Sequence, residues 1–344
     1  MSSKPVLLIS GGAGYIGSHA VLAAARHGFR PVVYDNLTAG HRWAVRKATL
    51  VVGDLADRAK LQRTFRKFRP AAVMHFASHI AVGESVQNPR KYYQENLTNA
   101  LVLLETLLRN QTRYFILSST AAVYGDPLRV PIPEDHPKEP VNPYGDAKWM
   151  LERILGWYDR GHGLKTTCLR YFNAAGADAS GLIGEAHDPE THLIPLVLDA
   201  AAGLRKDIQV FGTDYPTPDG TCIRDYIHVT DLAEAHYLAL KRMMRTGQSD
   251  VFNLGTGKGY SVEQVIRVTE KVTGRSVPVV YGKRRPGDPP RLVAKAVKAQ
   301  KTLRWKPKHS SLENILATAW NWHQKKQRMA VGGRRMATTQ KAKP

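Results

Sequence analysis

The stretch Val6-Leu7-Leu8-Ile9-Ser10-Gly11-Gly12-Ala13-Gly14-Tyr15-Ile16-Gly17-Ser18-His19 decides the fold. Its first four residues form an unbroken apolar run, which is typical of a strand buried on both faces of a parallel sheet. Gly11, Gly14 and Gly17 follow at intervals of three residues. Glycines in this pattern permit a tight turn and a close approach of the backbone to a pyrophosphate. A helix over residues 16–27 would then direct its N-terminal amides at that anion, so the stretch predicts a dinucleotide-binding turn.

The next predicted strand agrees with this interpretation. Residues 31–34 are apolar or aromatic, and Asp35 follows them, 18 residues after Gly17. An acid at this place is expected to accept a hydrogen bond from a ribose hydroxyl. It would also repel a 2′-phosphate, which favours NAD over NADP. A further strand over residues 49–54 ends in Asp54, whose carboxylate we expect to meet the adenine amine.

Strands and helices alternate as far as residue 173, which predicts a Rossmann-type α/β fold with a doubly wound parallel sheet. Beyond Gly176 the sequence becomes polar and rich in turns, and we predict a smaller C-terminal substrate-binding α/β domain. The expected division is residues 1–176, residues 177–323 with some segments returning to the first domain, and a basic, disordered tail over residues 324–344. The element ranges expected from the pattern are helices over 58–69, 92–109 and 192–204 and strands over 71–77, 114–117, 166–173 and 208–211.

Composition narrows the class of protein. The 344 residues are 43% hydrophobic and carry a formal net charge of +21. The last 21 residues hold seven Lys or Arg and no acid, so the remaining residues carry a net charge of +14. No nucleic-acid motif accompanies this charge, and we predict no nucleic-acid partner. Two cysteines give no disulfide framework and favour a cytoplasmic location, and no apolar run reaches the length of a membrane span.

A Tyr and a Lys stand four positions apart in Asn142-Pro143-Tyr144-Gly145-Asp146-Ala147-Lys148, at the opening of a helical run over residues 149–158. Four positions is about one helical turn, so both side chains leave the same face. A Lys ammonium lowers the pKa of a neighbouring phenol, which can then take a proton from a sugar hydroxyl. Thr120 follows a predicted strand, at the rim where such sheets bind ligands, and could hydrogen-bond a sugar O4.

With these motifs the chain resembles the extended short-chain dehydrogenase/reductase superfamily and, within it, the UDP-glucose (UDP-galactose) 4-epimerase family, from about Val6 to His323. The resemblance implies an isomerase that binds NAD and inverts C4 of a UDP-sugar, most simply UDP-glucose and UDP-galactose, and a homodimer. The other matching stretches are Asp35–Leu37, His75–Ala77, Val82–Val86, Ser118-Ser119, Val123–Gly125, Pro143–Gly145, Leu169–Asn173, Phe211-Gly212, Asp214–Pro216, Asp219-Gly220, Arg224–His228, Asn253–Gly255 and Arg284–Asp288.

The resemblance also implies roles for individual residues. Tyr144 would be the acid–base group, Lys148 its activator and a holder of the nicotinamide ribose, and Thr120 a partner of O4. The positions implied for the cofactor are Gly11, Gly14, Tyr15, Ile16, Gly17, Asp35, Asn36, Asp54, Leu55, Phe76 and Phe172, beside Tyr144 and Lys148. The positions implied for the substrate are Asn173, Leu193, Phe211, Arg224, Tyr226, Arg285 and Asp288, beside Thr120 and Tyr144.

Some positions depart from the family's commoner pattern and keep alternatives open. Ile80 replaces a Lys that contacts the cofactor, and Leu292 stands near the sugar, where a bulky Tyr can exclude an N-acetyl group. The segment His187–His192 resembles a branch that includes enzymes acting on UDP-pentoses. UDP-xylose/UDP-arabinose and UDP-N-acetylhexosamines therefore remain alternative substrates, and a non-catalytic NAD-binding scaffold is a remote alternative function. His187 and His192 match no metal-binding motif, and we predict no metal site.

Overall fold

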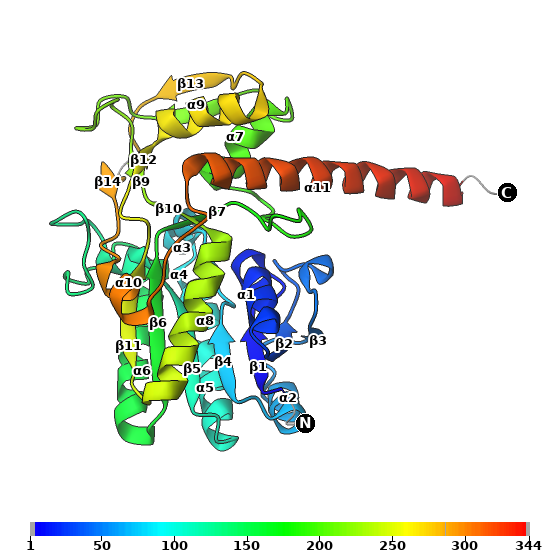
Figure 1. Ribbon diagram of the computed structural model, residues 1–344, viewed down its shortest axis with the longest axis vertical. Helices are drawn as coiled ribbons and strands as arrows, with labels where there is room; N and C mark the ends of the chain where they lie inside the picture. Colours follow the sequence, from blue (N-terminus) through cyan, green and yellow to red (C-terminus); the bar gives the residue numbers. More distant parts are fainter. Residues whose placement is uncertain (1–3, 286, 342–344) are drawn as a thin grey trace.

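The computed structural model describes residues 4–285 and 287–341. A seven-stranded sheet lies at its centre, with the strand order β11-β6-β5-β4-β1-β2-β3 and every neighbouring pair parallel (Figure 1). The chain is thus a doubly wound α/β protein of the Rossmann type, as the sequence predicts. The strands of this sheet are β1 Val6–Ser10, β2 Arg30–Asp35, β3 Thr49–Val52, β4 Ala72–His75, β5 Tyr114–Thr120, β6 Lys165–Tyr171 and β11 Asp250–Leu254.

Helices cover both faces of the large sheet. One face packs on α1 (Tyr15–Arg26), α8 (Val229–Thr246) and α10 (Val297–Leu303), and the other on α2 (Arg58–Phe68), α5 (Asn99–Arg109) and α6 (Pro143–His162). A separate core cluster of buried side chains lies on each face of the sheet. Successive side chains of β1 point to opposite faces: Leu7 and Ile9 belong to the first cluster, on the α1 side, and Leu8 belongs to the second, on the α5 side. All three are fully buried, which explains the unbroken apolar run.

A smaller layer lies beyond the carboxyl ends of the large sheet's strands (Figure 1). Its core packs around α7 (Leu193–Ala201), α9 (Val262–Thr273) and the first turns of α11 (Leu312–Lys341). The chain enters this layer after β7, and α8, β11 and α10 return to the large sheet. The predicted division at residue 176 stays a prediction. The short strands are β7 Asn173–Ala175, β8 Ile208–Phe211, β9 Ile223–Arg224, β10 Tyr226–His228, β12 Tyr260–Ser261, β13 Val279–Gly282 and β14 Arg291–Leu292.

The helix expected over residues 92–109 is more complex than its pattern. It consists of α4 (Pro89–Tyr92), a π-helical turn (Tyr93–Thr98) and α5, after the short α3 (Val82–Gln87). The wider π turn shifts the phase of the side chains. In α5, Leu103, Leu104 and Leu107 are fully buried, whereas Leu101 and Leu108 are only partly buried, as is Leu97 in the π turn.

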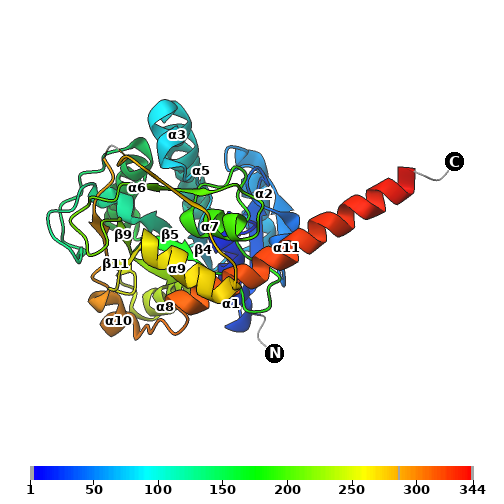
Figure 2. The same ribbon diagram turned by 90° about the horizontal axis from the view of Figure 1, so that it is seen from above.

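The described part of the predicted tail belongs to a helix, and the predicted disorder of residues 324–344 stays a prediction. Helix α11 continues to Lys341 and projects away from the body of the molecule (Figures 1 and 2). Its first turns are anchored by Leu312, Ile315 and Leu316, which are buried. Extension of an existing helix needs no new nucleus, and the Gln, Lys, Arg, Met and Ala residues that follow favour helix, whereas Gly332 and Gly333 disfavour it. Residues 342–344 of the predicted tail lie outside the described residues.

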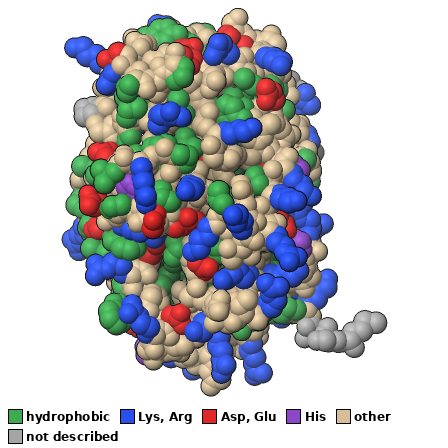
Figure 3. Space-filling view, turned by 60° about the vertical axis from the view of Figure 1, so that its left-hand side comes forward, with side chains coloured by type: hydrophobic (Ala, Val, Ile, Leu, Met, Phe, Trp, Pro, Cys, Tyr) green, Lys and Arg blue, Asp and Glu red, His purple; other side chains and the backbone are tan. Residues whose placement is uncertain are grey.

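The surface carries its positive charge in a scattered form. On the face drawn in Figure 3, Lys and Arg side chains are spread over both layers, with acidic and apolar side chains between them. In the part of the chain that the structure describes, no helix combines the length and apolar character needed to cross a membrane.

Candidate active site

The glycine-rich turn joins β1 to α1 and is built for close contacts. Gly11 has a φ of +75°, and a Cβ on it would lie 2.4 Å from the backbone nitrogen of Ala77. A Cβ on Gly17 would lie 2.1 Å from the carbonyl oxygen of Gly11. Helix α1 begins after Gly14, with no side-chain cap and no acid in its first turn. Its first amides thus keep their donors for an anion, and this cradle fits the pyrophosphate of a dinucleotide.

Asp35 ends β2 directly beside the glycine-rich turn. Its carboxylate accepts hydrogen bonds from the backbone of Ala13 (2.9 Å) and Leu37 (2.8 Å), and the residue is 7% exposed. Each carboxylate oxygen retains a lone pair that a ribose hydroxyl could use. Asn36 donates to Asp54 at 2.8 Å, so the two predicted adenosine contacts lie together. Leu55 is buried in the second core cluster.

Tyr15 and Ile16 open α1. The Tyr15 hydroxyl donates to the carbonyl of Gly176 at 2.6 Å, and Ile16 packs against the first core cluster. Tyr15 therefore links the predicted cofactor cradle to the point where the chain leaves the large sheet. Phe76 and Phe172 are both half-buried, and Phe76 lies 4.8 Å from the ring of His236.

The predicted acid–base pair lies in the first two turns of α6, which begins earlier than expected. Asn142 caps the helix by accepting from the backbone of Gly145 at 2.9 Å. Gly145 has no space for a side chain, because a Cβ would lie 2.5 Å from the carbonyl oxygen of Ala122. This approach brings the N-terminus of α6, with Tyr144, against the segment that follows Thr120.

Tyr144 is 9% exposed and Lys148 is 3% exposed. Burial raises the pKa of the Tyr144 phenol, and a hydrogen bond with Thr120 offsets part of this rise. Burial lowers the pKa of Lys148 to about 8, although the charge of Glu152 opposes this. The Lys148 ammonium donates to the carbonyl of Ser118 at 2.9 Å. Burial and the Thr120 hydrogen bond are the causes of the shift in the Tyr144 pKa, so the predicted lowering of this pKa by Lys148 stays a prediction.

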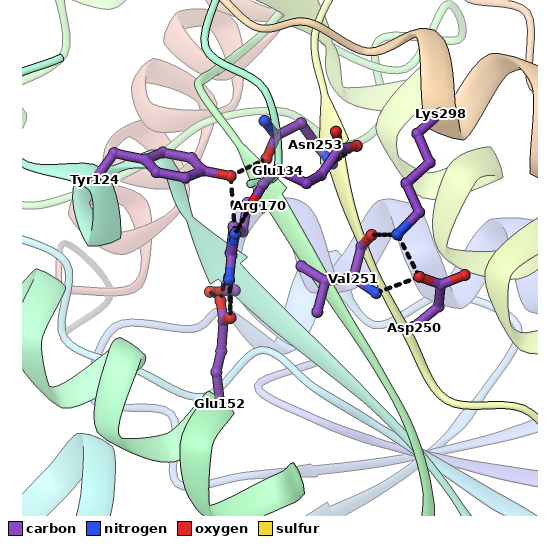
Figure 4. Close-up of polar contacts among 9 residues, drawn as sticks. Tyr124, Glu134, Glu152, Arg170, Asp250, Val251, Asn253 and Lys298 are labelled. Carbon is purple, nitrogen blue, oxygen red and sulfur yellow. Dashed lines mark hydrogen bonds and ion pairs between the residues drawn. The ribbon is translucent and has the colours of Figure 1, made fainter. Parts of the chain in front are cut away.

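A buried polar network that no sequence motif indicates joins Glu152, Arg170 and Tyr124 (Figure 4). Glu152 of α6 binds Arg170 of β6 through two nitrogens, and it accepts from the Ser119 hydroxyl at 2.5 Å. Arg170 also donates to the Tyr124 hydroxyl at 2.8 Å, which donates in turn to Asn253 at 2.6 Å. The network fixes the strand end that carries Thr120. One available signal was the position of Glu152, one turn after Lys148 on the same helix.

The predicted nucleotide-sugar residues fall into two groups. Arg285 and Asp288 line an open pocket of about 540 Å³. The Arg285 guanidinium lies 3.8 Å from the ring centre of Phe211, and Arg224 forms an ion pair with Asp288. These four residues converge although they come from separate segments of the chain.

The other three lie deeper in the smaller layer. Asn173 and Tyr226 are opposite each other in the parallel β7–β10 pair, and Tyr226 is 4% exposed. Leu193 begins α7 and packs against the same core cluster as Tyr226. Leu193 and Tyr226 therefore belong to the core of the smaller layer, and neither lines the pocket that Arg285 lines.

A doubly wound sheet with a glycine-rich turn, an acid after β2 and a buried Tyr–Lys pair defines a nicotinamide-dependent short-chain dehydrogenase/reductase. Residues 7–255 match the model of the NAD dependent epimerase/dehydratase family. The UDP-glucose 4-epimerase of Halalkalibacterium halodurans is 49% identical over 92% of this chain and 95% of its own length.

Solved structures agree with this assignment. The UDP-glucose 4-epimerase from Brucella ovis, in complex with NAD, superimposes with a TM-score of 0.90 at 48% identity, over 92% of this chain and 97% of that one. The UDP-glucose 4-epimerase from Stenotrophomonas maltophila, with bound NAD and formylated UDP-arabinopyranose, gives a TM-score of 0.92 at 37% identity, over 94% and 99% of the two chains. The chain belongs to the UDP-glucose 4-epimerase family of NAD-dependent isomerases.

Proposed function

We propose that this enzyme interconverts UDP-glucose and UDP-galactose by inverting C4 of the sugar. The observation that carries the proposal is the convergence of Tyr144, Lys148 and Thr120 at the carboxyl ends of the strands of the large sheet. Open α/β sheets bind their ligands at this edge, and the glycine-rich turn lies at the same edge. Bound NAD would supply a hydride acceptor and return the hydride within the same cycle.

Tyr144 is proposed to move the proton. Its phenol oxygen takes the proton from O4 as the sugar is oxidised at C4, and it returns the proton when the sugar is reduced. Burial excludes water from the phenol, which raises its pKa and keeps it protonated at rest. A cation must therefore favour the phenolate during the reaction. Lys148 lies on the same face of α6 and is proposed for this role, with Thr120 orienting O4.

The 4-keto sugar must turn over without leaving, so the enzyme has to hold the rest of the substrate firmly. Arg224 and Arg285 are proposed to bind the diphosphate, because guanidinium groups match phosphate oxygens in charge and shape. The ion pair with Asp288 orients Arg224. The guanidinium of Arg285 stacks on the ring of Phe211, which holds it in place. The proposed role of Asp288 is to accept hydrogen bonds from the uridine ribose.

The choice of sugar depends on the space beside Leu292. This residue pairs with Arg224 in the β9–β14 ladder and is half-buried. A Leu there leaves more room than a Tyr, so UDP-N-acetylhexosamines are the second candidate substrates. UDP-pentoses are the third candidate substrates, because the related structure from Stenotrophomonas maltophila contains formylated UDP-arabinopyranose.

Incubation with UDP-glucose, UDP-N-acetylglucosamine and UDP-xylose, with the products analysed by NMR, would test the proposal. We expect the 4-epimer of UDP-glucose to form fastest. One extra or missing methylene in a pocket typically changes specificity by about 10- to 200-fold, so differences among these larger substituents should be measurable. No turnover of UDP-glucose, with turnover of another sugar, would reassign the substrate. No turnover of any of the three would contradict the proposed activity.

We also propose a cytoplasmic enzyme of galactose metabolism that acts as a homodimer. Both cysteines, Cys168 and Cys222, are free, which agrees with a reducing compartment. Helix α6 exposes apolar surface: Trp157 is 63% exposed and Met150 is 36% exposed. Apolar side chains gathered on one exposed helix are typical of an interface between subunits.

For the homodimer we expect light scattering to give twice the mass of one chain, and Trp157→Glu to shift the mass towards the monomer. Val280→Glu is a matched control, because Val280 is also exposed but lies on β13 in the smaller layer. A monomeric wild-type enzyme at micromolar concentration would contradict the dimer.

A further inference from the structure

Four side chains that the proposed reaction does not use converge in the segment between β7 and α7. Glu185, His187, Glu190 and His192 each direct one ligand-type atom to a common point, and the four atoms all lie within 4.8 Å of one another. The spacing of these residues matches no metal-binding motif, so the expectation that the chain has no metal site did not consider them together. The irregular path of the segment brings them together.

The separations of these atoms match a coordination shell. His187 Nδ1 lies 3.1 Å from Glu185 and 3.6 Å from Glu190, and His192 Nδ1 lies 2.9 Å from an oxygen of each. A tetrahedral zinc ion with bonds of about 2.0–2.1 Å to nitrogen and oxygen places its ligand atoms about 3.3 Å apart. Small movements of the four side chains would therefore complete a tetrahedron.

The hydrogen bonding leaves one of these atoms without a partner. Among the described residues, His187 Nδ1 is a buried nitrogen that forms no regular hydrogen bond, and its nearest neighbours are carboxylate oxygens of Glu185 at 3.1 Å and Glu190 at 3.6 Å. A buried nitrogen in this condition costs free energy unless something satisfies it. A cation in the centre would satisfy it and would bind the lone pair of a neutral imidazole.

The surroundings hold the ligands in place. Trp322 donates to the carbonyl of Glu185 at 2.8 Å, and the His41 ring contacts the carbonyl of Ala186 at 2.8 Å. The Glu190 carboxylate is oriented by the backbone amide of His192 at 2.9 Å. The side chains of the two glutamates are 8% and 14% exposed, whereas that of His192 is 41% exposed, which leaves a path for an ion to enter.

We propose that Glu185, His187, Glu190 and His192 bind one divalent transition-metal ion, with zinc the best match to the donor set. Two carboxylates and two neutral imidazoles carry a charge of −2, which a divalent cation neutralises. Four protein ligands leave no open position, which is typical of a structural site. The ion would fix the segment that crosses Tyr15, whose ring centre lies 6.2 Å from that of His187. It would also fix the start of α7.

The competing arrangement has no metal and two protonated histidines. Burial lowers the pKa of His192, but the two glutamates outweigh it and raise the pKa to about 10; the same balance raises the pKa of His187 to about 9. Without a metal the cluster is therefore ion-paired. A metal must displace these protons, so the affinity for metal decides between the two arrangements.

The test uses the full chain, stripped with a chelator and then titrated with Zn²⁺ by calorimetry and with Co²⁺ by visible absorption. We expect one ion per chain, a Co²⁺ spectrum of the intense four-coordinate type, and a higher Tm with Zn²⁺. Loss of one ligand in His192→Gln should weaken binding by more than about 100-fold, since removal of even an outer-shell partner typically costs 10–100-fold. His162→Gln, on a different helix, is the matched control and should bind like the wild type.

Two results would overturn the proposal. One is a stripped wild-type chain that takes up no stoichiometric ion. The other is equal uptake by His192→Gln and the wild type, which would place the ion elsewhere. Glu190→Gln repeats the test if His192→Gln does not fold, and the Co²⁺ spectrum of the wild type requires no variant. None of these measurements depends on turnover of a sugar nucleotide.

Discussion

Replacement of Tyr144 by Phe should lower kcat by about 10²- to 10⁴-fold, the usual contribution of a positioned acid–base group. The change removes one hydroxyl from a ring that is 9% exposed, and the ring itself can keep its packing. We therefore expect the fold and the retention of NAD to stay close to those of the wild type. The rate of epimerisation of UDP-glucose, measured together with the NAD content of the purified variant, would check this result.

Tyr158→Phe is the matched control for this substitution. Tyr158 lies on the same helix and is partly buried against the second core cluster, so its hydroxyl is lost from α6 without any change near Thr120. It should keep nearly full activity. A Tyr144→Phe enzyme that retains NAD and works within about tenfold of the wild type would exclude Tyr144 as the acid–base group.

Local sequence predicted the strands β1 to β6 of the large sheet, but not β11, because the signals of those six strands are local. The run from Val6 to Ile9 is apolar since β1 is covered on both faces, and Gly11 and Gly17 stand where no Cβ fits. Asp35 was placed correctly at the end of β2, beside Ala13. In these elements the pattern of a few adjacent residues already contains the reason for the structure.

Features that depend on distant residues were not predictable in the same way. The π turn at residues 93–98 interrupts the helix expected over residues 92–109, and no residue pattern signalled it. The continuation of α11 depends on how its first turns are anchored in the smaller layer. The cluster around Glu185 arises in a segment without regular structure. Arg170 and Glu152 lie 18 positions apart on a strand and a helix, so only the fold shows that they pair.

The second large effect concerns that pair. Glu152→Ala should lower the free energy of unfolding by about 3–5 kcal/mol, because it leaves the Arg170 guanidinium charged and without a counter-ion. Both side chains are nearly inaccessible, with 3% of Arg170 and 2% of Glu152 exposed. In the wild type the bonds to Glu152 raise the pKa of Arg170 and outweigh the effect of burial. Without Glu152 the guanidinium still stays charged, because an Arg side chain is not deprotonated in proteins. Urea denaturation of the NAD-loaded enzyme would measure the change.

Glu105→Ala offers the matched control, since Glu105 pairs with Arg58 at the surface, where the two side chains are 43% and 61% exposed. An ion pair of that kind contributes at most about 1 kcal/mol, so this variant should unfold almost like the wild type. In the double variant Glu152→Leu/Arg170→Met both charges are absent, and much of the lost stability should return, because no buried charge is left unpaired. Equal losses in Glu152→Ala and Glu105→Ala would mean that water reaches Arg170 when Glu152 is removed. Arg170 would then not depend on Glu152, and the strand end that carries Thr120 would owe its position to the backbone ladder between β5 and β6 alone.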